Sequence, residues 1–145
     1  MLNDRNLKRL PLALTSLVVF ACARGPSFQE YLSLLNERAG SSSKDCGVVR
    51  LMQPHSEAVS CAQTALKGRT PFMVVFQVQG IDSEIFHGLA VDASGNGTWL
   101  QWDSDSYGGG YHFVTKSWIK EEACSQPVVL DAAPPIQCRS SQSGG

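Results

Sequence analysis

The chain has 145 residues, of which 43% are hydrophobic and 17% are charged. This balance excludes a wholly disordered chain and a membrane protein with many spans, and the length suits one domain with a modest core. The formal net charge is −1, which argues against a nucleic-acid-binding protein.

The first 21 residues have the pattern of a secretory signal peptide. Three basic residues, Arg5, Lys8 and Arg9, precede an apolar run over residues 10–21. This run is too short to cross a bilayer, which takes ~20 apolar residues. We therefore expect residues 1–21 to be removed on export. The leader carries three basic residues and one acidic residue, so its removal leaves a net charge of −3 on the mature chain.

The apolar run ends in Val19-Phe20-Ala21-Cys22, which resembles the lipobox of bacterial lipoproteins. Phe20 departs from that pattern, because the lipobox usually has a small residue there. The resemblance implies cleavage before Cys22 and attachment of acyl chains to it, and each buried methylene contributes ~0.8 kcal/mol to membrane binding. Ala23 in place of Asp implies transfer to the outer membrane of a Gram-negative cell, facing the periplasm. The alternative is an ordinary signal peptide in which Cys22 is incidental.

A short amphipathic helix is expected at the start of the mature chain. Phe28, Tyr31 and Leu35 recur at helical spacing, and Gly40 is a natural stop. A polar, serine-rich stretch follows, so we expect residues 22–45 to form a partly independent helix and its tether.

A second helix is expected over residues 56–67, because Ala58, Cys61, Ala62 and Ala65 share one face. Its small side chains favour close packing against another element of the core.

Four strands are expected after this helix. Apolar alternation predicts strands over residues 72–79 and 84–91, and a turn then leads to a strand over 98–102, which should form a hairpin with the second. Residues 111–119 supply the fourth strand. We expect an α+β domain over residues 46–138, a helix packed on a four-stranded antiparallel meander, with a disordered tail over 139–145.

Cys46, Cys61, Cys124 and Cys138 remain once Cys22 is set aside, and an even number in an exported chain is typical of two disulfides. Three pairings are possible. We favour Cys46–Cys61 and Cys124–Cys138, because each closes a short loop and would contribute ~3 kcal/mol, but the crossed pairings stay open.

Zinc is the competing explanation of the cysteines. No Cys-x-x-Cys occurs, and the histidines at 55, 87 and 112 lack the paired spacing of a structural zinc site. We expect neither a bound metal nor a cofactor.

A weak calcium-loop pattern begins at Asp92. Asp92, Ser94, Asn96 and Asp103 occupy the first, third, fifth and twelfth positions, and Gly97 the sixth. A calcium loop usually ends in a bidentate Glu and lies between helices. Since this segment has neither feature, we favour an ordinary hairpin turn.

Two further segments contain chemically useful side chains. Asp103, Asp105 and Tyr107 lie in a polar, glycine-rich stretch that is a candidate recognition loop. The ingredients of a hydrolytic site are also present, but no Gly-x-Ser-x-Gly motif occurs and no spacing forces them together. These ingredients are Asp82, Ser83, His87, Asp103 and His112.

Cys61, Pro71-Phe72, residues 80–83 and residues 103–110 are similar to small proteobacterial lipoproteins with a disulfide-containing domain of uncharacterised activity. The similarity covers roughly residues 46–138 and implies no functional residues. We expect a lipid-anchored envelope protein that acts as a non-enzymatic binding module, held at the membrane by its anchor and free to bind an envelope protein. The alternatives are an inhibitor or immunity-like protein that inserts the candidate recognition loop into a secreted hydrolase, and a small hydrolase.

Overall fold

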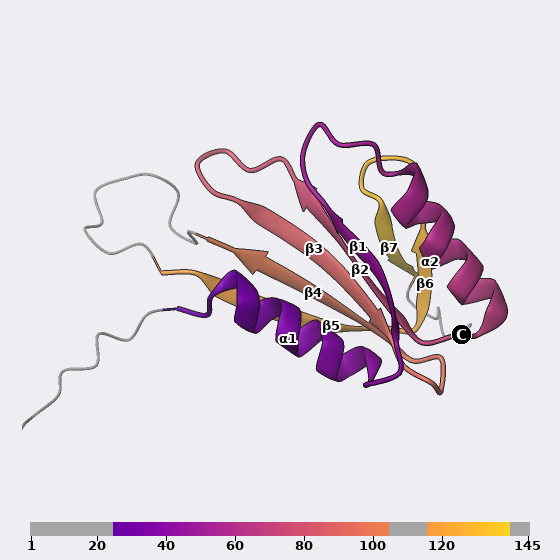
Figure 1. Cartoon of the computed structure of the whole chain (residues 1–145). Coiled ribbons are helices and arrows are strands. Elements are labelled where there is room, and N and C mark those ends of the chain that lie inside the picture. The colour runs from indigo at the N-terminus through magenta and orange to yellow at the C-terminus, as the bar shows by residue number, and fades with distance from the viewer. Residues whose placement is uncertain (1–24, 105–115, 140–145) are drawn as a thin grey trace, which may run out of the picture.

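The computed structural model describes residues 25–104 and 116–139. Two helices and seven strands are arranged as in Figure 1. Their bounds are α1 Phe28–Ala39, β1 Lys44–Val49, α2 Ser56–Gly68, β2 Phe72–Val78, β3 Ile85–Val91, β4 Gly97–Asp103, β5 Trp118–Cys124, β6 Gln126–Val129 and β7 Ile136–Arg139.

Five strands form one mixed sheet in the order β1-β2-β3-β4-β5. The crossover through α2 makes β1 parallel to β2, and β2 to β5 form an antiparallel meander. Val78, Ile85, Asp103 and Trp118 pair in turn and so form one row across four strands. Strands β6 and β7 pair only with each other among the described strands and form a separate hairpin.

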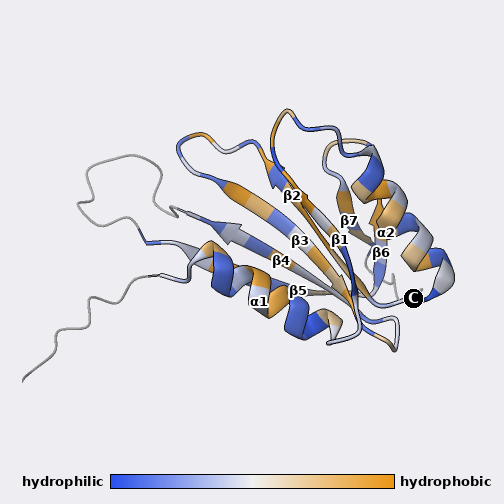
Figure 2. Ribbon diagram, viewed as in Figure 1, coloured by the Kyte–Doolittle hydropathy of each residue, from blue (hydrophilic) through white to orange (hydrophobic). Residues whose placement is uncertain are grey.

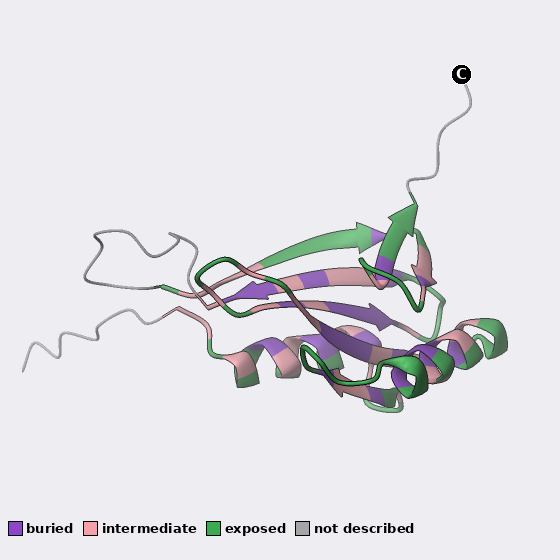
Figure 3. Cartoon of the chain, turned by 90° about the horizontal axis from the view of Figure 1, so that it is seen from above, coloured by how far each residue is buried: buried purple, intermediate pink, exposed green. Residues whose placement is uncertain are grey.

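Side chains from both faces of the sheet are buried, which gives the molecule three layers. Tyr31, Leu35 and Ala39 of α1 pack against one face, whereas α2 and the β6–β7 hairpin pack against the other. Apolar residues accordingly concentrate on β2 and β3 and on one side of each helix (Figure 2). Seen from above, edge strand β5 and strand β7 are largely exposed (Figure 3).

Helix α1 belongs to the core, although we expected it to stand partly apart. The hydroxyl of Ser27 accepts a hydrogen bond from the backbone of Glu30, whose carboxylate bonds back to Ser27, and Gly40 ends the helix at φ 92°. Tyr31 and Leu35 are fully buried over Gly88 of β3, where a glycine leaves room for both side chains.

The expected helix on a four-stranded antiparallel meander is wrong as the fold. The structure is mostly β: a five-stranded mixed sheet, a two-stranded sheet and two helices. The missed strand β1 is short and polar at its start and has an irregular register between Asp45 and Val48, so it lacks clear alternation. Residues 111–115 of the expected strand over 111–119 lie outside the described residues, and β5 overlaps that range only at its end. The rest of β5 was missed, because it is an edge strand whose charged residues obscure its pattern.

Two disulfides cross-link this small domain, as expected. Cys46 at β1 is bonded to Cys61 of α2, and Cys124 at the end of β5 is bonded to Cys138 of β7. The first joins the strand and helix of the parallel crossover. The second joins the main sheet to the β6–β7 hairpin.

None of the helices in the described ranges is long and apolar enough to cross a membrane.

Candidate functional site

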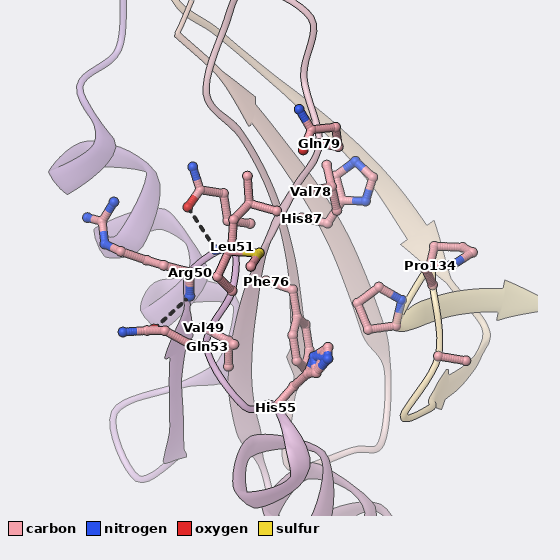
Figure 4. Close-up of a pocket in the computed structure, with 15 residues that line it drawn as sticks. Val49, Arg50, Leu51, Gln53, His55, Phe76, Val78, Gln79, His87 and Pro134 are labelled. Carbon is pink, nitrogen blue, oxygen red and sulfur yellow. Dashed lines mark hydrogen bonds between the residues drawn. The ribbon is translucent and has the colours of Figure 1, made fainter.

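A cavity of about 520 Å³ lies at one end of the sheet, on the face covered by α2. Three elements surround it: the loop from Arg50 to His55, the ends of β2 and β3, and the turn from Ala132 to Pro135 (Figure 4). Its volume is in the range of small-molecule sites in proteins.

The first wall is the loop between β1 and α2. The side-chain oxygen of Gln53 accepts a hydrogen bond from the backbone N–H of Arg50 at 2.9 Å, and the side-chain oxygen of Gln77 accepts one from Leu51 at 3.2 Å. The first bond closes the loop on itself, and the second holds it against β2 (Figure 4). Leu51 and Met52 are thereby part of the cavity lining.

The second wall is formed by Phe76, Val78 and His87, which belong to neighbouring strands. The His87 ring packs edge-on against Trp99, with ring centroids 5.0 Å apart. Burial lowers the pKa of His87, and a side-chain hydrogen bond with Gln101 opposes this shift. The imidazole is therefore mainly neutral at pH 7, and this wall presents an uncharged surface.

The third wall is the turn of the β6–β7 hairpin, with Pro134 and Pro135 at the cavity. The backbone N–H of Leu130 donates to the carbonyl of Pro135 at 2.8 Å, which closes the turn. The side-chain amide of Gln63 donates to the carbonyl of Val129 at 2.9 Å, which ties the hairpin to α2.

The chemistry of the lining favours binding of apolar groups. Valine, leucine, methionine, phenylalanine, alanine and proline side chains make up most of it, and its polar members are Arg50, three glutamines and two histidines. Among the described residues, no carboxylate, serine, threonine or cysteine lines the cavity. The arrangement can therefore hold the apolar part of a ligand, and its glutamine side chains can form hydrogen bonds with an uncharged polar atom of the same ligand.

The structure brings together only part of the candidate hydrolytic set. Asp82 and Ser83 lie in the turn between β2 and β3, whereas His87 lies on β3 and faces Trp99. No hydrogen bond joins His87 to Asp82 or Ser83 among the described residues. His112 lies outside the described residues.

Asp103, the first member of the candidate recognition loop, ends β4 and is only 7% exposed. Asp105 and Tyr107 lie outside the described residues, as do the signal peptide and Cys22.

Asp92, Ser94 and Asn96 of the calcium-loop pattern lie in the β3–β4 turn, whereas Asp103 ends β4 at the opposite end of the strand. One oxygen of Asp92 accepts hydrogen bonds from the backbone N–H groups of Ser94 and Asn96 at 2.8 and 2.9 Å. These bonds lower the pKa of Asp92. Gly95 provides the positive φ of 83° that the turn needs. No cluster of three or more His, Cys, Asp and Glu suited to a metal ion occurs in the described ranges.

Sequence reasoning missed the cavity, because its lining comes from three separate segments that only the fold brings together. One signal was available: the proline-rich stretch at 134–135 follows Cys124 and precedes Cys138, so a bridge there implies a fixed, apolar turn. Its position opposite His55 and Val78 depends on the hairpin, which was not predicted.

Comparison with known proteins finds no match to a protein family, a curated protein or a solved structure.

Proposed function

We propose that this chain is a lipid-anchored protein of the bacterial envelope that binds an uncharged, apolar ligand without catalysing a reaction. The observation that carries the binding role is the apolar cavity between the β1–α2 loop, the end of β2 and β3, and the β6–β7 turn. The lipobox pattern ending in Cys22 carries the anchor and the location.

The lining supports a binding role and an uncharged ligand. Since His87 is mainly neutral at pH 7 and none of the described residues that line the cavity is a carboxylate, the walls offer little to stabilise a charged group. Arg50 is at the rim, but its guanidinium lies 3.6 Å from the carboxylate of Glu84 and over the ring of Phe86. Nucleophilic catalysis would need a side chain such as serine, threonine, cysteine or a carboxylate at the cavity, and the described lining contains none of these.

Titration with an uncharged fluorescent probe, N-phenyl-1-naphthylamine, tests the binding role. We expect saturable fluorescence enhancement with wild type. Ala132 is exposed at the mouth of the cavity, so Ala132→Trp narrows it and should weaken binding by about tenfold, which corresponds to ~1.4 kcal/mol.

Ala123→Trp is the matched control, because Ala123 is an exposed alanine on edge strand β5, away from the cavity. It should bind the probe as wild type does. Equal affinity in both variants, or no saturable binding by wild type, would contradict the proposed site.

The anchor is tested separately by Cys22→Ser. We expect the wild-type protein to fractionate with membranes and to carry acyl mass, and the variant to appear in the soluble fraction. A variant that stays with membranes, together with a wild type lacking acyl mass, would show that Cys22 is not the anchor.

A further inference from the structure

Three large apolar side chains are exposed in the part of the chain that the structure describes, and all lie in two loops. Ile81, between β2 and β3, is 98% exposed, Met52, between β1 and α2, is fully exposed, and Leu51 beside it is 41% exposed. We call Leu51, Met52 and Ile81 the apolar tip. Both loops lie at the same end of the sheet (Figure 1).

The two loops of the apolar tip are linked to each other. Leu51 donates its backbone N–H to Gln77 near the end of β2. The Arg50 guanidinium lies 3.6 Å from the carboxylate of Glu84, which is in the same β2–β3 loop as Ile81. The three apolar residues are therefore held at one end of the domain by contacts between the loops.

Met52 has a backbone conformation that costs stability. Its φ of 66° lies in the left-handed region, which disfavours a residue with a side chain by roughly 1 kcal/mol. Glycine or asparagine would suit this position better. Because this exposed methionine makes the fold less stable, we infer that its side chain contacts something other than this domain.

The start of the described chain is fixed at this same end of the sheet. The carbonyl of Pro26 accepts hydrogen bonds from Trp102 Nε1 at 2.8 Å and from Ser117 Oγ at 2.7 Å. Gly25 lies so close to Ser117 that no Cβ would fit. Trp102 and Ser117 each precede a member of the row of paired residues that crosses the sheet from Trp118 to Val78. Val78 in that row comes directly before the loop that contains Ile81.

Rough dimensions of the chain then relate the tip to the anchor. Cys22 precedes Gly25 by three residues, and three extended residues span at most ~11 Å. The three strand spacings from β5 to β2, which precedes Ile81, add ~14 Å across the sheet, and the fourth spacing, to β1 before Leu51 and Met52, brings this to ~19 Å. A lipid on Cys22 therefore keeps this end of the domain close to the bilayer.

We propose that the apolar tip contacts the bilayer that holds the anchor, with Met52 and Ile81 in the lipid interface. This inference rests on the proposed lipid anchor. It explains why the side chains of Met52 and Ile81 are exposed at the end of the domain where the described chain begins, three residues after Cys22. Leu51 and Met52 also line the cavity, so the contact places the cavity beside the lipid.

The charges around the tip point to an apolar contact. Asp82 follows Ile81, and Glu84 lies 3.6 Å from Arg50, so the loops carry both signs of charge. Attraction to anionic headgroups needs clustered basic residues. We therefore expect the contact to form on neutral phosphatidylcholine–phosphatidylethanolamine vesicles.

An environment-sensitive label tests the contact on the acylated, full mature protein in such vesicles. Because Cys22 is acylated in this state and the other four cysteines are disulfide-bonded, an introduced cysteine is the only free thiol. We would place a nitrobenzoxadiazole label on Met52→Cys and on Ile81→Cys. Ser94→Cys is the matched control, because Ser94 is exposed in the β3–β4 turn at the opposite end of the sheet.

We expect the labels at 52 and 81 to shift to shorter emission wavelengths, to lose severalfold in quenching by aqueous iodide, and to be quenched by nitroxide-labelled lipid. The label at 94 should stay accessible to iodide. An acylated protein whose three labels are equally accessible overturns the membrane contact and leaves the anchor in place. Protection from iodide without quenching by the labelled lipid assigns the tip to a protein contact and also overturns it. A protein without acyl mass overturns the anchor, and with it this orientation.

Discussion

Gly88→Ala tests whether α1 is part of the core. A Cβ at residue 88 would lie 2.5 Å from the hydroxyl oxygen of Tyr31 and 2.6 and 2.9 Å from the two methyl carbons of Leu35. Carbon atoms in good contact are ~3.5–4.0 Å apart, so the helix must move by about 1 Å or the side chains must leave their positions. Neither side chain has solvent to move into, because both are fully buried.

The size of the effect follows from two opposing contributions. Overpacking of a core costs ~1–3 kcal/mol, whereas replacing a glycine by alanine stabilises by ~0.4–1 kcal/mol through the unfolded chain. We expect Gly88→Ala to lower the free energy of unfolding by about 0.5–2 kcal/mol. The measurement is urea unfolding followed by circular dichroism, with a lower midpoint and an unchanged slope.

Gly68→Ala is the matched control for Gly88→Ala. Gly68 ends α2, is exposed, and has only an ordinary contact of 3.4 Å with Thr70 at the position of a Cβ. It should be neutral or stabilising. Leu35→Ala should relieve the crowding, so the double variant with Gly88→Ala should be more stable than additivity predicts, by ~0.5–3 kcal/mol. A stabilising Gly88→Ala, or strict additivity with Leu35→Ala, would refute the packing of α1 described here.

Three further substitutions probe other features. Met52→Gly removes left-handed strain of roughly 1 kcal/mol, but glycine costs ~0.4–1 kcal/mol through the greater freedom of the unfolded chain, so urea unfolding should show a rise of at most ~0.6 kcal/mol in the free energy of unfolding; a clear loss would show that the methionine side chain stabilises the fold. Glu121→Gln should lower it by at most ~1 kcal/mol at pH 7, because the ion pair with Arg38 is more than a third exposed. The hydrogen bond from Arg38 lowers the pKa of Glu121 below its ordinary 4.5. The stability difference between wild type and Glu121→Gln should therefore disappear as the pH falls below 4.5 and the carboxylate is protonated, and a difference that persists in acid would contradict this origin. Burial lowers the pKa of His87 below its ordinary 6.5, so the unfolded chain takes up a proton more readily and stability should fall as the pH drops below about 6.5. His87→Gln should reduce this fall in urea midpoints measured from pH 7.5 to 5, with His55→Gln as the control for loss of an imidazole; an unchanged fall in His87→Gln would contradict the assignment.

The elements with strong periodicity were predictable from the sequence. Helix α2, strands β2 and β3, and the β3–β4 hairpin lie within a residue or two of their expected bounds, because each combines a regular apolar pattern with clear turn residues. The even cysteine count predicts two disulfides, and the structure has the favoured pairing, in which each bridge joins two cysteines that are close in the sequence.

The elements that were missed depend on tertiary contacts. Strand β1 is irregular at Gly47, with φ 94°, and is stabilised by parallel pairing with β2 that no local pattern reveals. Pro127 interrupts the pattern of β6, which has only four residues. Helix α1 showed its apolar stripe, but its docking on the sheet required the space above Gly88, which is visible only when β3 is placed.

The position of the disulfides accounts for the cavity as well as for the fold. One closes the segment from Cys46 to Cys61, which contains the first wall, and the other closes the segment from Cys124 to Cys138, which contains the third. Both walls are loops with few buried side chains, so core packing alone would hold them weakly. The second wall needs no such support, because Phe76 and His87 are paired within the sheet. Cross-links on the first and third walls and strand pairing on the second allow a domain with a modest core to keep a cavity open without filling it with its own side chains.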